Sequence, residues 1–124
     1  MSCYYTFVNG TATYKIGRLE RAIARSAEIA GRCRKQTVEI SKDGQMPFLD
    51  VFFDSRVGAV VFAPSKKEKK QKKLVRELSD VQYNRKIAEH DGQSAKRLKA
   101  REETLYTELR NMREVYRNGV LRFQ

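Results

Sequence analysis

Apolar residues along this chain switch three times between the two-residue period of β-strands and the three- to four-residue period of helices. The first β-like segments, residues 4–8 and 11–15, are rich in aromatic and β-branched residues. They flank Asn9-Gly10, a pair that tolerates the positive φ angles of a two-residue hairpin turn. The sequence therefore predicts an N-terminal β-hairpin.

Residues 18–34 predict an amphipathic helix, because apolar side chains recur there at three- and four-residue steps. Its predicted apolar face consists of Leu19, Ala22, Ile23, Ala27, Ala30 and Cys33. Three further β-like runs, at 37–41, 48–53 and 57–62, are joined by short turn segments and predict an antiparallel meander. The last two runs are apolar at odd and even positions alike, which predicts that each is covered on both faces or central in the sheet. The predicted fold class is therefore α+β.

The C-terminal half predicts two helices. Ser65 and Glu68 form a capping-box signature directly after Pro64, and they open a helix with apolar residues at heptad-like spacing. A second apolar stripe follows a polar break at residues 90–92, and its frame differs from the first by three residues. A helical hairpin folded at Gly92 explains this shift, and a continuous coiled coil with a stammer would produce the same three-residue shift.

These elements predict one structural domain in two parts: residues 1–64 form a sheet unit with the first helix, and residues 65–124 form a basic helical hairpin packed on it. The second apolar stripe either packs back on the first or forms a two-fold dimer interface. Its members are Leu98, Leu105, Leu109, Met112 and Tyr116. The chain is predicted to leave the last helix at Gly119 and then to add a short strand or dock on the core.

The chain is strongly basic, since 26 Lys and Arg against 15 Asp and Glu give a formal net charge of +11. Such a charge predicts anionic partners, and residues 64–124 hold 17 of the basic and nine of the acidic residues. A lysine cluster surrounds the start of the predicted helix, where backbone N–H groups and the helix dipole favour an anion. Its candidate phosphate-binding residues are Lys66, Lys67, Lys69, Lys70 and Lys73. The alternative is a solvated lysine run without a ligand.

A second basic feature lies along one side of the predicted helix at 18–34. Its members, at three-, four- and seven-residue steps, are Arg18, Arg21, Arg25 and Arg32. Arginine suits bidentate contact with phosphate, which makes this stripe a candidate nucleic-acid-binding surface. The alternative is the ordinary polar face that any amphipathic helix needs.

Composition also bears on other classes of protein. A membrane span needs about 20 consecutive apolar residues, which no stretch approaches, and the N-terminus lacks the features of a signal peptide. The predicted location is the cytoplasm, or the host cytoplasm for a viral protein. Cys3 and Cys33 have no metal-binding spacing and predict two free, mostly buried thiols. His90 is the single histidine and lies in a polar break, so no metal, cofactor or catalytic site is predicted.

The order helix, three antiparallel strands, helix over about residues 18–80 resembles the double-stranded-RNA-binding domain. That family starts its second helix with Ser-Lys-Lys-x-x-Lys, and residues 65–70 match this pattern. The resemblance implies that Lys66, Lys67 and Lys70 contact phosphates across the major groove of A-form RNA. Gly44 and Phe48 are similar to the family's first strand turn and to the aromatic residue that opens its middle strand. The sequence departs from the family in having no histidine between the first helix and Ser65, where the family offers one to the minor groove.

A shorter likeness concerns the GIY-YIG nucleases. It rests on Tyr4-Tyr5, on residues 14–17 and on Arg25, eight residues after Gly17. The family's metal-binding glutamate lies on a later helix, and no residue here singles itself out for that role.

These features predict a non-enzymatic protein that binds nucleic acids through phosphates and prefers structured or double-stranded RNA. The alternative is a small basic protein-interaction module, or an inhibitor of the phage or mobile-element type, that binds a nucleic-acid-handling protein complex. A homodimer through the C-terminal helices is compatible with both. A GIY-YIG-like nuclease is a minor alternative.

Overall fold

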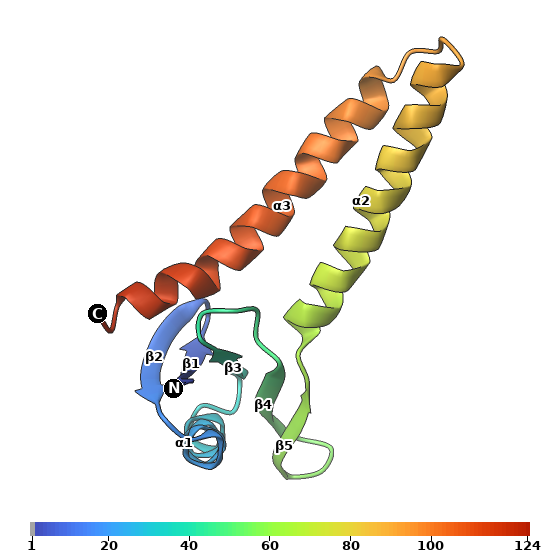
Figure 1. The fold of residues 1–124 in the computed structure, drawn as a ribbon. Helices are drawn as coiled ribbons and strands as arrows, with labels where there is room; N and C mark the ends of the chain where they lie inside the picture. The colour runs from blue at the N-terminus through green and yellow to red at the C-terminus, as the bar shows by residue number, and fades with distance from the viewer. Residues whose placement is uncertain (1) are drawn as a thin grey trace. The chain divides into compact units, whose positions relative to one another are not determined.

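A computed structural model describes residues 2–124, which fold into five strands and three helices (Figure 1). The elements in chain order are β1 (Tyr4–Val8), β2 (Thr11–Ile16), α1 (Leu19–Arg32), β3 (Val38–Lys42), β4 (Leu49–Asp54), β5 (Ala59–Pro64), α2 (Lys66–His90) and α3 (Lys96–Leu121). The strands form one antiparallel sheet in the order β2-β1-β3-β4-β5. The predicted α+β class, N-terminal hairpin, meander and pair of C-terminal helices are therefore confirmed.

The chain divides into two compact units, which are described separately. The sheet unit comprises residues 2–68 together with residues 113–124, and the helical unit comprises residues 69–112. The first turn of α2 and the C-terminal end of α3 thus belong to the sheet unit. None of the helices among residues 2–124 is long and apolar enough to cross a membrane.

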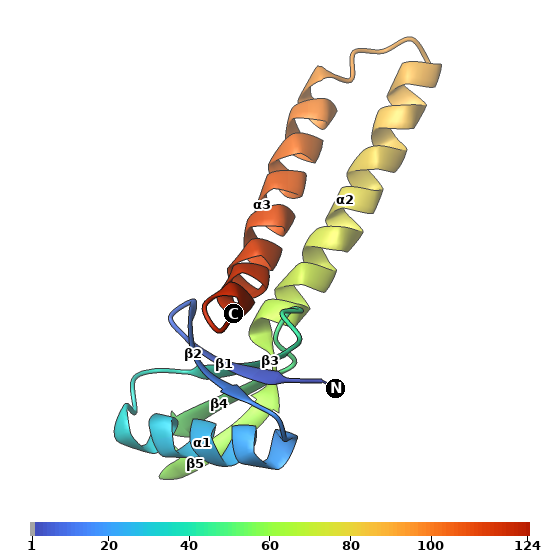
Figure 2. The same ribbon diagram turned by 60° about the vertical axis from the view of Figure 1, so that its left-hand side comes forward.

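One face of the sheet is covered by α1 (Figure 2). The buried residues of this core are Ala22, Ala30, Val38, Ile40 and Val51, with Ile23, Ala27 and Ile29 packed against them. Of the predicted apolar face of α1, the members Ala22, Ile23, Ala27 and Ala30 belong to this core. Leu19 is only partly buried, and Cys33 follows the helix and is exposed. Cys3 is partly buried, so both thiols are free as predicted but neither is fully buried.

The opposite face of the sheet is covered by the end of α3. Tyr5, Phe7, Ala12 and Tyr116 form its buried core, and Val120 and Phe123 pack against them. The helix continues through Gly119, where a Cβ atom would clash with the ring of Phe7, so the predicted exit at Gly119 is wrong. The glycine is there for close approach and not for helix termination, whereas the predicted docking of the tail on the core is correct.

The hairpin turn has the predicted geometry, with φ angles of 51° at Asn9 and 78° at Gly10. Of the two strands predicted to be central or covered on both faces, β4 lies inside the sheet as predicted. The prediction is wrong for β5, which lies at the sheet edge, is only partly buried and has Phe62 51% exposed. An edge strand has a neighbour on one side only, and α1 reaches little beyond Val60.

In the helical unit, α2 and α3 run side by side as an antiparallel hairpin (Figures 1 and 2). Its core consists of Leu74, Leu78, Leu105 and Leu109, with Val81 and Met112 packed against them. Arg85 Nε donates to Glu102 at 2.6 Å, and Gln82 donates to the Tyr106 hydroxyl at 2.6 Å. Gly92 has a φ of 73° at the connection, as expected for a fold at that residue.

Candidate nucleic-acid interface and a buried acidic pocket

A basic groove lies between the end of β2 and the first half of α1. It has a volume of about 710 Å³, and the charged side chains that line it are Lys15, Arg18, Arg21, Arg25 and Glu28. Four cations against one carboxylate leave the groove positive. The structure thus brings together three of the four predicted stripe arginines, while Arg32 lies outside, in the last turn of α1. Lys15 is a residue that the helix-based prediction missed, because it comes from a neighbouring strand.

Arg25 is held in place at the side of this groove. Its Nη1 donates to Glu28 Oε2 at 3.3 Å, and its guanidinium lies 4.9 Å from the centre of the Tyr14 ring. The ion pair is about half exposed on both sides, and exposed pairs of this kind contribute little to stability. Arg25 is therefore ordered yet able to exchange Glu28 for a phosphate at small cost.

The start of α1 faces the same groove. Arg18 occupies the N-cap position in extended geometry, and no side chain among residues 2–124 caps the helix there. Its uncapped backbone N–H groups add positive potential to that of Arg18 and Arg21.

The start of α2 is different, because its first backbone donors are used within the protein. The Lys66 N–H donates to Asp50 Oδ2 at 3.1 Å, and the Glu68 N–H donates to Ser65 Oγ at 3.3 Å, as the capping box predicts. The side chains of Lys66 and Lys67 are exposed in the sheet unit. Lys69, Lys70 and Lys73 belong to the helical unit and are exposed as well. None of residues 2–124 lines both the groove and the pocket that contains Lys66 and Lys67, so the groove arginines and these two lysines form separate surfaces.

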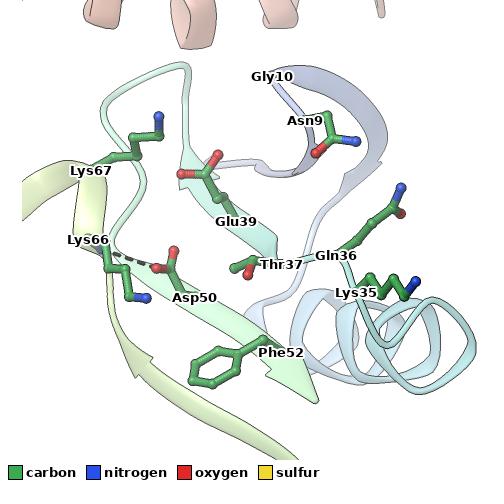
Figure 3. Close-up of a pocket in the computed structure, with 10 residues that line it drawn as sticks. All are labelled: Asn9, Gly10, Lys35, Gln36, Thr37, Glu39, Asp50, Phe52, Lys66 and Lys67. Atoms are coloured by element: carbon green, nitrogen blue, oxygen red, sulfur yellow. Dashed lines mark hydrogen bonds between the residues drawn. The ribbon is translucent and has the colours of Figure 1, made fainter. Parts of the chain in front are cut away.

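That pocket, of about 410 Å³, contains two carboxylates on adjacent strands (Figure 3). Glu39 on β3 lies directly opposite Asp50 on β4, and they are 8% and 3% exposed. Asp50 Oδ1 is buried and has no hydrogen-bond partner among residues 2–124. The other lining residues are Asn9, Gly10, Lys35, Gln36, Thr37, Phe52, Lys66 and Lys67. The sequence prediction did not include this site, although a charged residue in the middle of an apolar strand is the signal that marks it.

Glu39 is bound to the end of α3. The Tyr116 hydroxyl donates to both of its carboxylate oxygens, at 2.9 Å each. Burial raises the pKa of Glu39 above its ordinary value; Tyr116 opposes this, Asp50 adds to it and Lys67 lowers it. Burial and the charge of Glu39 also raise the pKa of Tyr116, which therefore keeps the proton that it donates.

The raised pKa of Glu39 predicts a pH-dependent stability. Between the ordinary carboxyl value and the raised one, the folded protein holds a proton that the unfolded chain releases, so stability falls as pH rises through this window. Glu39→Gln keeps an acceptor for Tyr116 and removes the ionisation. The variant is expected to match the parent near pH 4 and to be more stable at pH 7, as measured by urea unfolding at both values. Glu28→Gln, at an exposed site, is the control. If the parent became more stable relative to Glu39→Gln as the pH rises, the raised pKa assigned to Glu39 would be wrong.

The predicted interface residues are placed in two different cores. Leu105 and Leu109 are buried in the helical unit, where Met112 packs beside them, so the stripe packs back on α2. Leu98 is partly buried. Tyr116 lies in the core of the sheet unit instead. Of the two alternatives for the stripe, packing within the chain is the one found.

No group of three or more His, Cys, Asp or Glu side chains in the described part of the chain is arranged to hold a metal ion. The chain matches no protein-family model, no curated protein and no solved structure. The resemblance to the double-stranded-RNA-binding domain therefore stays a prediction that rests on residues 18–80 alone.

Proposed function

We propose that this protein binds nucleic acids through their phosphates, prefers structured or double-stranded RNA, and has no enzymatic activity. The observation that carries the proposal is the basic groove, where Lys15 on β2 joins Arg18, Arg21 and Arg25 on α1. Arginine side chains offer forked donors that match phosphate oxygens. Since the groove is built on a strand and a helix with a shared core, its cations are held by rigid elements.

The preference for RNA is supported by the order of elements. Helix α1, the meander β3-β4-β5 and helix α2 follow one another as in the double-stranded-RNA-binding domain. A-form RNA is recognised largely by shape and through phosphates and 2′-hydroxyls, which suits a basic surface without a base-reading motif. In this proposal Lys66 and Lys67 of the sheet unit form a second phosphate-binding surface, and Lys70 of the helical unit also contacts phosphate.

The proposal predicts a steep salt dependence that originates in the groove. The triple variant Arg18→Gln, Arg21→Gln, Arg25→Gln is expected to lower the slope of log affinity against log salt by about 2 to 3. At about 0.15 M salt this corresponds to roughly a hundredfold loss of affinity. Fluorescence anisotropy with a labelled RNA duplex of about 20 base pairs, long enough for a site of about 16, measures both quantities.

The matched control removes the same charge elsewhere. Arg76, Arg97 and Arg110 are exposed in the helical unit, and their triple replacement by Gln is expected to change affinity far less. An equal loss in both triple variants would show diffuse attraction by net charge and would contradict the groove. Replacing Lys66, Lys67 and Lys70 by Gln measures the contribution of these three lysines in the same assay.

A second candidate is a protein-interaction module, and one observation favours it. Val75, Tyr83 and Ile87 are 41%, 66% and 43% exposed along α2 in the helical unit. Large apolar side chains gathered on one helix are typical of a protein-binding surface. A complex with one protein that survives high salt, together with an absence of duplex binding, would place this function first.

A further inference from the structure

We propose that the acidic pocket between β3 and β4 binds a guanine base, either in a free nucleotide or as an unpaired residue of a nucleic-acid strand. The second of these sources rests on the proposed function, and the first does not. The proposal is carried by Asp50, a residue that is 3% exposed, lines the pocket and has one carboxylate oxygen without a hydrogen-bond partner among residues 2–124.

The two oxygens of Asp50 have different surroundings. Oδ2 accepts the Lys66 N–H at 3.1 Å, which fixes the orientation of the carboxylate (Figure 3). Oδ1 is buried without a partner, and a buried acceptor left unsatisfied costs on the order of 1–3 kcal/mol. A ligand that brings a hydrogen-bond donor to this oxygen recovers that cost. Glu39, directly across the strand pair, has further acceptor lone pairs beyond those used by Tyr116.

The rest of the pocket fits the other parts of a nucleotide. Phe52 lies on the same face of β4 as Asp50 and presents a partly exposed ring to the pocket. Such a ring stacks on a base, whatever the base is. Lys35, Lys66 and Lys67 line the pocket as cations that can meet a phosphate. A simple cationic ligand would fit the carboxylates but would be repelled by these three lysines.

Guanine is selected by the pattern of donors on its edge. Its Watson–Crick edge carries N1–H and the N2 amino group side by side, which are two neighbouring donors for two neighbouring carboxylates. Adenine and cytosine each offer one amino group beside an unprotonated ring nitrogen, which a carboxylate repels. A base in a continuous duplex has this edge already paired, so the guanine must be unpaired.

The experiment compares bases within one strand. The probe is a fluorescein-labelled oligoadenylate that carries one central guanosine, 7-deazaguanosine, inosine or adenosine. The 7-deaza base keeps the Watson–Crick edge, whereas inosine lacks the N2 amino group. Guanosine and 7-deazaguanosine are expected to bind alike and about tenfold more tightly than inosine or adenosine. GMP against AMP, measured by calorimetry, tests the free nucleotide.

Two pairs of variants assign the preference to the pocket. Asp50→Asn retains an acceptor for Lys66 and replaces the unpartnered oxygen by a donor, so the preference for guanine is expected to vanish. Asp54→Asn makes the same change further along β4 and outside the pocket, and this variant is expected to keep the preference for guanine. Phe52→Leu is expected to weaken all bases by about tenfold, and Phe53→Leu, whose ring lies under Arg34, is not.

The outcomes separate this proposal from the proposed function. Equal binding of all four strands, with no binding of GMP, would overturn the guanine site and leave phosphate binding in place. Binding of GMP without binding of any strand would support the pocket for the free nucleotide and contradict the proposed function. A guanine preference that survives in Asp50→Asn would overturn the assignment to this pocket.

Discussion

Replacing Leu105 with glutamate is expected to unfold the helical unit. The Leu105 side chain is 0% exposed and lies in the core formed with Leu74, Leu78 and Leu109. A glutamate there loses the apolar contacts and buries a charge that no cation of this core neutralises, which costs about 4 kcal/mol or more. Because whole domains are stable by only about 5–15 kcal/mol, the α2–α3 hairpin is not expected to survive this loss.

Hydrogen exchange reports the result residue by residue. Amides of residues 69–112 are expected to lose protection, while those of β1 and β3 retain it. Leu121→Glu is the control, since it makes the same change on the same helix at a side chain that is 59% exposed. Unchanged protection of the hairpin in Leu105→Glu, with an unchanged melting temperature, would show that this stripe is not a core.

Phe7→Ala is expected to be the most costly truncation in the sheet unit. The Phe7 ring is 0% exposed, packs edge-to-face on Tyr116 with 4.9 Å between ring centres, and fills the space next to Gly119. Removal of such a ring costs about 3–5 kcal/mol through lost transfer energy and the cavity that remains. Thermal unfolding followed by near-ultraviolet circular dichroism measures the loss through the tyrosines of this core.

Phe62→Ala provides the comparison for that truncation. It deletes the same atoms from edge strand β5, where the ring is half exposed, so a loss of less than about 1 kcal/mol is expected. Equal losses in the two variants would contradict the placement of α3 over β1.

The parts of the fold that were predicted correctly depend on residues close together in the sequence. The Asn9-Gly10 turn, the period of α1 and the break at Gly92 all depend on neighbours within a few residues. The errors involve distant neighbours. Gly119 is typical of a helix end, but its hydrogen atom faces Phe7, and a ring that far away in sequence leaves no local trace. Likewise, the apolar residues of β5 do not reveal that the strand lies at an edge.

In the candidate sites, too, the features that depend on nearby residues were predicted and those that depend on distant residues were not. The arginines of the groove share one helix, so their spacing was enough to predict them. Lys15 joins them only because β2 ends beside the start of α1. The pairing of Glu39 with Asp50 depends on the register between β3 and β4, and the unpartnered oxygen depends on where α2 begins. None of these relations follows from spacing along the chain.

The sheet unit is built from segments that lie on either side of the helical unit in the sequence, and this determines the order in which the two units can be completed during synthesis. The Tyr116–Glu39 hydrogen bond joins residues 77 positions apart, and Arg122 donates to the carbonyl of Ala12 across 110 positions. A nascent chain emerges from its N-terminus, so Tyr116, Val120 and Phe123 leave the ribosome after all five strands and after the helical unit. Until then the face of the sheet that carries Tyr5 and Phe7 has no cover from α3. The helical unit, whose sequence is contiguous and precedes Tyr116, is expected to form before the sheet unit is completed.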